Sequence, residues 1–348
     1  MRVVYIGHYD TGSTSGMRGE YLRQILNPSE YCVVNIDLPL KKTSKVFRSI
    51  GWRYRIGPLI SNINDWINVS LPAGELDLVW IDKGVFIKPS VLHELRSRCK
   101  TLVHFTPDPA FRYHRSSLFY EGLPDYDHCI TTKSYELDEY KKYGAKNILY
   151  CTQGYDPLIH KPSVPFAEKS GLTFIGHMEA DRLEIISRLL EKKVTIKLAG
   201  INWESFARKH RGNNYLQYTS GGIFGENYAR TISGSLLGLG FLSRIVPELH
   251  TTRTFEIPAC GTALVTERND ETNHLFNDDE AIFFSNPDEL LERVTHALAH
   301  LDELKQITEK GYQRITGGGY DYKSILQRLI SEMQIPVNAN KTEAAGWA

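Results

Sequence analysis

The chain contains 348 residues, enough for two hydrophobic cores of ordinary domain size. Hydrophobic residues account for 41% and charged residues for 24%, which is typical of a soluble globular protein and excludes a disordered or fibrous one. Lys and Arg number 41 and Asp and Glu also number 41, so the formal net charge is zero and nucleic acid is not expected as a partner.

The cysteines and the N-terminal residues indicate a compartment. The cysteines are scattered without a C-x-x-C pair, which argues against a zinc site or a disulfide framework and fits a reducing environment. Met1 leads directly into the apolar run RVVYIG without a long apolar segment, so no signal peptide is predicted. No apolar run approaches the roughly 20 residues that span a bilayer. We therefore expect a cytoplasmic protein.

Short β-branched runs alternate with longer helical patterns along the whole chain, which predicts parallel sheets with crossover helices. The cycle restarts near residue 171, so we expect two Rossmann-like domains of an α/β protein. The predicted strands are Val3–Ile6, Cys32–Ile36, Leu78–Ile81, Thr101–Phe105, His128–Thr131 and Asn147–Tyr150, then Leu172–Ile175, Val194–Ala199, Tyr215–Tyr218, Leu236–Leu239, Ala263–Thr266 and Ala281–Phe284.

The first strand is followed by a glycine-bearing turn, IGHYDTGSTSGMRGEYLRQIL, that leads into a helix. Gly7, Gly12 and Gly16 do not have the G-x-G-x-x-G spacing, so the sequence gives little support to a nicotinamide site with Asp37 as its acidic residue. A strand-to-helix turn without any ligand is the alternative.

A basic and aromatic run follows the second strand, KKTSKVFRSIGWRYRIG at residues 41–57. Such a mixture suits an anionic membrane surface or a lipid-phosphate acceptor, and hence peripheral contact with the inner face of the membrane. The alternative is an exposed helix that packs its aromatic residues on the core. The basic residues are Lys41, Lys42, Lys45, Arg48, Arg53 and Arg55, and between them lie Phe47, Ile50, Trp52 and Tyr54.

Polar residues gather at the end of another first-half strand, in HFTPDPAFRYHRS. Ligands of open α/β folds bind at the carboxyl ends of strands, so Asp108 is our candidate catalytic base or sugar-orienting carboxylate, and His104 is the second catalytic candidate. Pro107 and Pro109 hold the backbone of Asp108 extended. A plain turn initiated by the Asp-Pro step is the alternative.

The second half opens with a proline-rich segment and another glycine turn. Residues 156–170 carry three prolines and read as an interdomain linker. The turn FIGHMEADRLEIISRLL follows, in which Gly176 lets a ligand approach the backbone and His177 and Arg182 can direct positive charge toward a diphosphate. Arg182 as a solvated first-turn residue is the alternative.

The stretch PELHTTRTFEIPACG, residues 247–261, is the most informative part of the chain because it places Glu248 and Glu256 across a turn-to-helix junction. The hydroxyls of Thr251 and Thr252 suit a helix N-cap, and the opening turn of that helix offers N–H groups to a diphosphate. Arg253 adds a fixed positive charge. Gly261 is predicted to end the helix.

This stretch resembles the donor site of retaining, GT-B-fold glycosyltransferases of group 1, whose E-x7-E signature is met by Glu248 and Glu256. The run from Arg253 through TFEIPACG, with Leu275-Phe276 and the later PDELLERV, looks most like the CgeB-like branch. The resemblance implies the GT-B fold, with two Rossmann-like domains whose parallel sheets face across a cleft. It also implies a hexosyltransferase that uses a UDP- or GDP-linked sugar, with a role in bacterial cell-surface or spore glycan synthesis.

The same resemblance implies the roles of individual residues. Glu256 binds the ribose and Glu248 contacts the donor sugar as a catalytic residue. The first glycine turn contacts the acceptor, which is a glycan, a lipid-linked sugar or a small molecule. The implied acceptor-binding residues are His8, Asp10 and Gly12, and the donor-binding residues are Gly176, His177, Arg182, His250, Thr251, Thr252, Arg253 and Glu256.

Two departures from the group 1 pattern leave other functions open. The glycine-rich loop that follows the first glutamate is LHTT here, and the usual Arg and Lys of a neighbouring loop have no clean match. A sugar-nucleotide epimerase with the GT-B fold and a non-catalytic coat or scaffold protein are therefore alternatives. No D-x-D motif lies at a strand end and Asp278-Asp279 lies in a polar loop, so we expect no metal site, no cofactor and metal-independent transfer.

The predicted domain organisation follows from these boundaries. Residues 1–155 form the acceptor-binding domain, 156–170 the linker and 171–318 the nucleotide-sugar-binding domain. A helix at about 320–335 packs back onto the first domain, as the resemblance implies. The polar segment 336–348 is predicted to be disordered.

Overall fold

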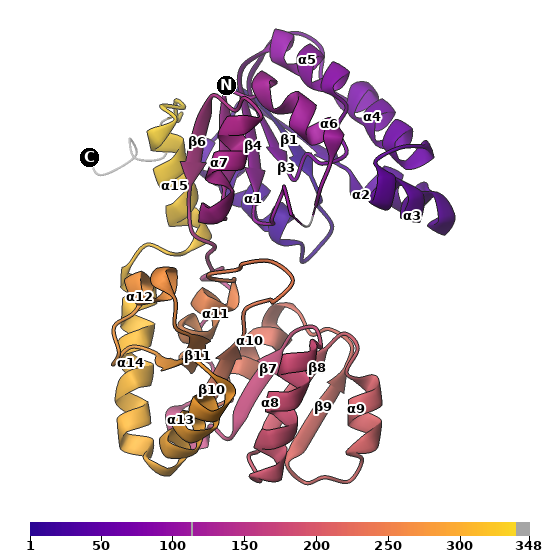
Figure 1. Ribbon diagram of the computed structural model, residues 1–348. Helices are drawn as coiled ribbons and strands as arrows, with labels where there is room; N and C mark the ends of the chain where they lie inside the picture. The colour runs from indigo at the N-terminus through magenta and orange to yellow at the C-terminus, as the bar shows by residue number, and fades with distance from the viewer. Residues whose placement is uncertain (113, 339–348) are drawn as a thin grey trace, which may run out of the picture. The chain divides into compact units, whose positions relative to one another are not determined.

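The computed structural model describes residues 1–112 and 114–338, and it divides the chain into two compact units (Figure 1). The first unit consists of Met1–Thr152 together with the segment that begins at Tyr322. The second unit is the continuous stretch Gln153–Asp321. No helix of the described residues is long and apolar enough to cross a membrane.

The first unit is built on a parallel six-stranded sheet in the order β2-β1-β3-β4-β5-β6. Its strands are β1 (Arg2–Gly7), β2 (Glu30–Asn35), β3 (Leu76–Asp82), β4 (Cys99–Thr106), β5 (His128–Thr131) and β6 (Asn147–Tyr150). Its helices are α1 (Thr14–Leu26), α2 (Asp37–Lys42), α3 (Lys45–Tyr54), α4 (Pro58–Ser70), α5 (Pro89–Arg98), α6 (Ser117–Gly122), α7 (Leu137–Lys142) and α15 (Tyr322–Glu332).

Helices cover both faces of this sheet, so the central strands are apolar on both sides. In β3 the residues from Leu78 to Ile81 alternate between the two cores and are fully buried. One core contains residues of α4 and α5, and the other contains residues of α1 and α15. The late helix α15 is therefore part of the first unit, where Ile325 and Leu329 share a core with Leu22.

The second unit repeats the design with the strand order β12-β11-β10-β7-β8-β9, again all parallel. Its strands are β7 (Leu172–Ile175), β8 (Ile196–Gly200), β9 (Leu216–Ser220), β10 (Leu237–Gly240), β11 (Ala263–Glu267) and β12 (Ile282–Phe284). Its helices are α8 (Ala180–Glu191), α9 (Glu204–Lys209), α10 (Gly225–Ser233), α11 (Arg253–Ala259), α12 (Asp270–Leu275), α13 (Pro287–Ala299) and α14 (Leu301–Gly317).

All twelve strands predicted from the sequence are present, with boundaries shifted by a few residues at most. The segment 156–170, expected as a linker, is irregular except for a short 3-10 turn at Phe166–Glu168 and lies within the second unit. The expected disordered segment begins with residues that contact α1, because Asn338 donates from Nδ2 to the carbonyl oxygen of Asn27 at 2.9 Å. Residues 339–348 lie outside the described residues.

Candidate functional site

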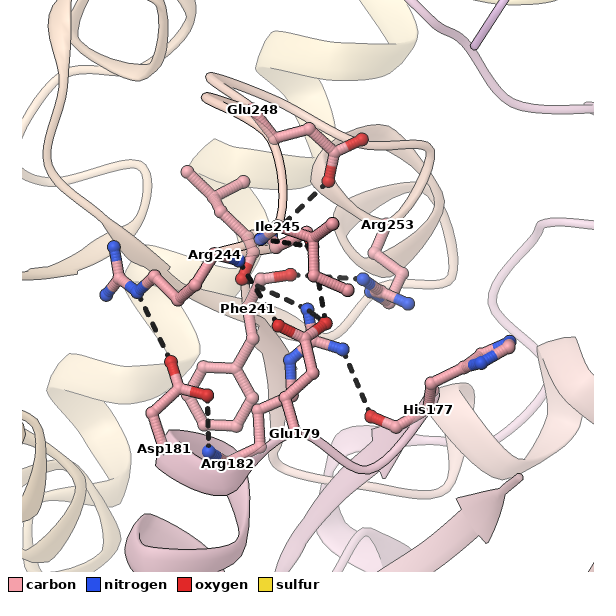
Figure 2. Close-up of polar contacts among 12 residues, drawn as sticks. His177, Glu179, Asp181, Arg182, Phe241, Arg244, Ile245, Glu248 and Arg253 are labelled. Atoms are coloured by element: carbon pink, nitrogen blue, oxygen red, sulfur yellow. Dashed lines mark hydrogen bonds and ion pairs between the residues drawn. The ribbon is translucent and has the colours of Figure 1, made fainter. Parts of the chain in front are cut away.

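Two arginines of the second unit lie side by side at the carboxyl ends of β7 and β10 (Figure 2). Arg182, in the first turn of α8, is 4% exposed and donates to the carbonyl oxygens of His177 and Leu242, both at 3.0 Å. Arg253, the first residue of α11, donates to the carbonyl oxygens of Ile175 and Phe241 at 3.2 and 3.0 Å. The interpretation of Arg182 as a solvated residue is therefore wrong.

The two positive charges repel each other in a partly desolvated place. Burial lowers the pKa of Arg182, and the charge of Arg253 lowers it further. Glu179, whose Oε1 is 2.9 Å from Arg182 Nη2, opposes this shift, as do the charges of Asp181 and Glu248. The Nε atoms of both arginines are buried without a hydrogen-bond partner in the described residues. An anion placed here would relieve the repulsion, because an arginine remains cationic in proteins.

Gly176 makes room for this arrangement. A Cβ added at Gly176 would lie 3.0 Å from Arg253 Nη1 and 2.8 Å from the ring of Phe174. The carbonyl oxygen of Gly176 accepts from Trp203 Nε1 at 2.9 Å, which fixes the turn from the other side. The imidazole of His177 is exposed and directed away from the two guanidinium groups, so His177 contributes its carbonyl to the site (Figure 2).

Glu248 lies in the loop between β10 and α11. This loop contacts the first residues of α8 (Figure 2). Glu248 Oε2 is 3.4 Å from the backbone nitrogen of Ser243, and its charge reaches Arg182. The backbone nitrogen of Arg244 donates to Glu179 at 3.2 Å, and the Arg244 side chain pairs with Asp181 at 3.2 Å. These contacts attach the loop that contains Glu248 to the start of α8, where Arg182 lies.

The helix α11 begins where the sequence predicts, but its start is capped differently. Thr252 has helical backbone angles, φ −56° and ψ −38°, and makes no side-chain cap hydrogen bond. An N-cap residue needs an extended backbone for its hydroxyl to reach the first turn, so the predicted Thr252 cap is wrong. The backbone nitrogen of Thr251 instead donates to Thr254 Oγ1 at 3.1 Å. Gly261, at φ +69°, follows the end of this short helix as predicted.

Glu256, predicted to bind ribose, is 7% exposed and already has protein partners. Tyr228 of α10 donates its hydroxyl hydrogen to Glu256 Oε2 at 2.5 Å, and His160 Nε2 lies 3.8 Å from Glu256 Oε1. Sequence reasoning missed both partners. His160 lies in the segment 156–170, which was predicted only as an interdomain linker, and no role was predicted for Tyr228.

His250 is a buried support in this structure. Its Nε2 accepts from the backbone nitrogen of Gln153 at 3.0 Å, so its Nδ1 carries the proton. That Nδ1 donates to Glu271 Oε2 at 2.5 Å. Both ring nitrogens are engaged inside the second unit, which leaves none for the donor that this residue was predicted to bind.

In the first unit, Asp108 forms a cluster with Lys83 and His114 beyond the carboxyl ends of β3 and β4. Asp108 Oδ2 is 2.5 Å from Lys83 Nζ and 3.5 Å from His114 Nε2, and the Asp108 side chain is 31% exposed. Burial raises the pKa of Asp108, but the hydrogen bond with His114 and the charge of Lys83 outweigh it and hold the pKa well below the usual range. Asp108 is therefore a weak base, better suited to orienting a substrate than to removing a proton.

His104 does not reach a site in this structure. Its side chain is 0% exposed and packs against Phe119, Tyr126 and Tyr140 in the core of the first unit. Burial lowers the pKa of His104 to about 3. A strand residue that faces the core cannot contact substrate, so the structure does not support the catalytic role predicted for His104.

Residues of the first glycine turn form hydrogen bonds with the carboxylate of Asp37. His8 Nδ1 is 2.6 Å from Asp37 Oδ1, and the backbone nitrogens of Tyr9 and Asp10 donate to Asp37 Oδ2 at 3.0 and 3.2 Å. Both oxygens of Asp37 are thus occupied, which removes the acidic group that a nicotinamide site would need. Gly12, at φ +82°, has nothing within 4 Å of an added Cβ, and its acceptor-binding role stays a prediction.

The basic and aromatic run, residues 41–57, comprises the end of α2, all of α3 and the residues that lead into α4. Several apolar side chains on it are exposed, whereas Arg55 is buried and lies over the Phe86 ring at 4.9 Å. Trp52 packs edge-on against the same Phe86 ring, at a centroid distance of 4.7 Å, so part of the run packs on the core. The exposed apolar residues are Val46, Phe47, Trp52, Tyr54 and Ile56.

The predicted absence of a metal site stays a prediction. Within residues 1–112 and 114–338, no group of three or more His, Cys, Asp or Glu residues has an arrangement that could hold a metal ion. Asp278 and Asp279 form surface ion pairs with Arg268 and Lys310, each at 2.7 Å.

Comparisons with known proteins agree with this architecture. Residues 182–331 match the family model described as "Glycosyl transferase-like". No curated protein sequence matches the chain. Among solved structures, sucrose-phosphate synthase from Thermosynechococcus elongatus is 11% identical, with a TM-score of 0.65 over 96% of this chain and 99% of that one. The α,α-trehalose 6-phosphate synthase from Burkholderia multivorans is 10% identical, with a TM-score of 0.66 over 96% and 98%.

A third similar structure is that of HepE from Anabaena in complex with UDP, which is 13% identical, with a TM-score of 0.63 over 96% of this chain and 100% of that one. The likeness of these structures establishes the GT-B fold, and the family match lies on the stretch that contains Arg182, Glu248, Arg253 and Glu256. The predictions of a GT-B fold and of a glycosyltransferase are confirmed. The assignment to the CgeB-like branch stays a prediction.

Proposed function

We propose that this GT-B glycosyltransferase transfers a sugar from a nucleotide-diphosphate sugar to an acceptor, with retention of configuration and without a metal ion. The observation that carries the proposal is the pair of adjacent cations Arg182 and Arg253, with Glu248 and Glu256 in the segment that leads into and through α11. UDP is our first choice of nucleotide, because HepE has been crystallised with UDP and with UDP-glucose.

The two arginines would stabilise the leaving diphosphate. Negative charge grows on the diphosphate as the bond to the sugar breaks, and fixed positive groups aimed at that charge lower the barrier. The guanidinium groups are held in place by four backbone carbonyls before any ligand arrives, so little reorganisation is needed. Arg182 would thereby do the work of the Arg and Lys pair that the sequence lacks.

The two glutamates would bind the two ends of the donor. Glu256 would accept hydrogen bonds from the ribose, and Glu248 would contact the hydroxyl groups of the transferred sugar. In this proposal the enzyme orients and stabilises the reacting groups and supplies no covalent nucleophile.

The first unit would bind the acceptor. Asp108 is ionised at neutral pH and, with Lys83 and His114, could orient hydroxyl or phosphate groups. Gly12 and the turn around His8 and Asp10 would form a second contact. A glycan, a lipid-linked sugar and a small molecule all fit this chemistry, and a role in bacterial cell-surface or spore glycan synthesis belongs to the same proposal.

A peripheral membrane contact through residues 41–57 is also part of the proposal. Exposed Phe47 and Tyr54 stand among lysines and arginines, and residues 38–64 contain no Asp or Glu. Such a surface suits anionic headgroups, each nearby cation contributing about 1 kcal/mol. Co-sedimentation with anionic vesicles tests it. The contact is excluded if wild type stays in the supernatant, or if charge reversal at Lys42, Lys45 and Arg48 leaves binding unchanged.

The donor assignment is tested by thermal shift with a panel of UDP- and GDP-linked sugars. A ligand present at 100 times its dissociation constant stabilises the folded protein by roughly 2.7 kcal/mol. Binding followed by transfer to an acceptor, with the anomeric configuration read by NMR, would support the proposal. Conversion of the donor without any acceptor would indicate the epimerase alternative, and binding of no nucleotide would indicate the scaffold alternative. Transfer that stops in EDTA and returns with magnesium would contradict metal independence.

A further inference from the structure

Three side chains from three segments of the second unit meet at Glu256. His160 comes from the irregular segment before β7, Tyr228 comes from α10, and Glu256 comes from α11. The rings of His160 and Tyr228 meet edge to face, with centroids 5.7 Å apart. The side chains of His160 and Glu256 are each 10% exposed, so the group is nearly enclosed.

The contacts of His160 fix which of its nitrogens carries the proton. The backbone nitrogen of Asp156 donates to His160 Nδ1 at 3.0 Å, so Nδ1 is an acceptor in the neutral ring and the hydrogen is on Nε2. That Nε2–H lies 3.8 Å from Glu256 Oε1, which is too far for a direct hydrogen bond. The pair therefore presents a donor and an acceptor across a gap that one hydroxyl group can bridge.

Tyr228 forms a hydrogen bond with the other carboxylate oxygen of Glu256, Oε2. Burial, followed by the negative charge of Glu256, raises the pKa of Tyr228 well above its ordinary value, so the phenol stays protonated and donates. Its hydrogen bond to Oε2 fixes the carboxylate and leaves Oε1 directed at the gap beside His160.

We propose that His160 and Glu256 together bind the ribose diol of the nucleotide, with one ribose hydroxyl accepting from His160 Nε2 and donating to Glu256 Oε1, and that Tyr228 is the positioning residue. This inference rests on the proposed function, because it requires a ribonucleotide in the donor site. A bridging hydroxyl would pair with both His160 Nε2 and Glu256 Oε1, whereas a sugar without that hydroxyl makes neither hydrogen bond. The pair therefore selects a ribose over a deoxyribose.

The test compares the affinities of UDP, 2′-deoxy-UDP, 3′-deoxy-UDP and pyrophosphate by isothermal titration calorimetry. His160→Asn keeps an acceptor near Asp156 and removes the Nε2–H donor, and Tyr228→Phe removes only the hydroxyl group. His93→Asn, at an exposed position of the first unit, is the matched control. Pyrophosphate reports on the arginine pair without any ribose, so a merely damaged fold would lower its affinity as well.

Wild type should bind UDP about tenfold more tightly than the deoxy analogue that lacks the bridging hydroxyl. His160→Asn should lose about that factor for UDP, show little further loss with that analogue, and bind pyrophosphate as wild type does. Tyr228→Phe should reduce the discrimination while keeping pyrophosphate affinity. The inference is overturned if wild type binds UDP and His160→Asn discriminates the analogues as wild type does, or if His160→Asn weakens pyrophosphate equally. Absence of UDP binding to wild type would overturn the proposed donor as well.

Discussion

The guanidinium of Arg253 occupies the space that a side chain at position 176 would fill, since Arg253 Nη1 would stand 3.0 Å from a Cβ added at Gly176. Glycine at this position therefore leaves room for the Arg253 side chain. Its effect on a bound ligand is indirect, through the position of that arginine. This contact joins the first turn of the second unit to the segment that contains Glu256.

Gly176→Ala should consequently weaken UDP binding and lower the melting temperature. The added methyl group would press on Arg253 and on the Phe174 ring, 2.8 Å away, and overpacking of this kind costs about 1–3 kcal/mol. Calorimetric titration and thermal unfolding give the two values. Gly317→Ala, at the end of α14 where an added Cβ meets nothing within 4 Å, is the control and should lower neither value. Equal behaviour of the two variants would contradict the packing argument.

Arg253→Lys should lower the affinity for UDP by about tenfold or more, because a lysine cannot donate to two carbonyls and still face a diphosphate, and a hydrogen bond to a charged group contributes about 1.5–3 kcal/mol. Arg188→Lys on the surface of α8, where Arg188 pairs with Asp288, is the control. Titration of UDP and pyrophosphate separates the two parts of the donor. If both variants bind both ligands as wild type does, the arginine pair is not the diphosphate site.

His250→Ala should destabilise the second unit and leave UDP affinity of the folded protein nearly unchanged. The substitution leaves the backbone N–H of Gln153 and the Glu271 carboxylate without their present partner, and a buried unpaired polar group costs about 1–3 kcal/mol. Urea unfolding gives the first quantity and calorimetry the second. A large loss of UDP affinity with unchanged stability would restore the donor-binding role predicted from the sequence.

Asp108 should make stability depend on pH in the acid range. Its pKa in the folded protein lies below the usual value of about 3.9, so its contribution to stability is present above that value and is lost as the pH falls through the folded pKa. The stability difference between wild type and Asp108→Asn should therefore shrink as the pH falls below about 4. Urea unfolding at several pH values measures it, with Asp138→Asn at an exposed site as control. A difference that stays constant with pH would contradict the ion-pair geometry.

Much of the fold could be predicted from the sequence because parallel strands that are buried on both faces appear as nearly continuous apolar runs. Runs such as LVWI in β3 and ALVT in β11 leave few alternatives. The start of α11 could be predicted, but the helical backbone angles of Thr252 could not. Because those angles prevent its hydroxyl from capping the helix, the predicted cap is wrong.

The site was predictable only where the chemistry lies within one segment. Arg253 and Glu256 stand in the same short helix, so their pattern is visible in the sequence. His160 and Tyr228 reach Glu256 through contacts between segments, and no local pattern marks them. The prediction for His104 was wrong for a related reason. The sequence does not distinguish a strand histidine that faces the hydrophobic core from one that reaches the exposed end of the strand.

The return of α15 to the first unit has a consequence for synthesis on the ribosome. The chain leaves the first unit after Thr152 and re-enters it at Tyr322, so the second unit is inserted into the first. Until Ile325, Leu326 and Leu329 have emerged, the core they share with α1 lacks one wall. The second unit is continuous and can close its core earlier, so the half of the protein that begins the sequence is the half that completes its folding last.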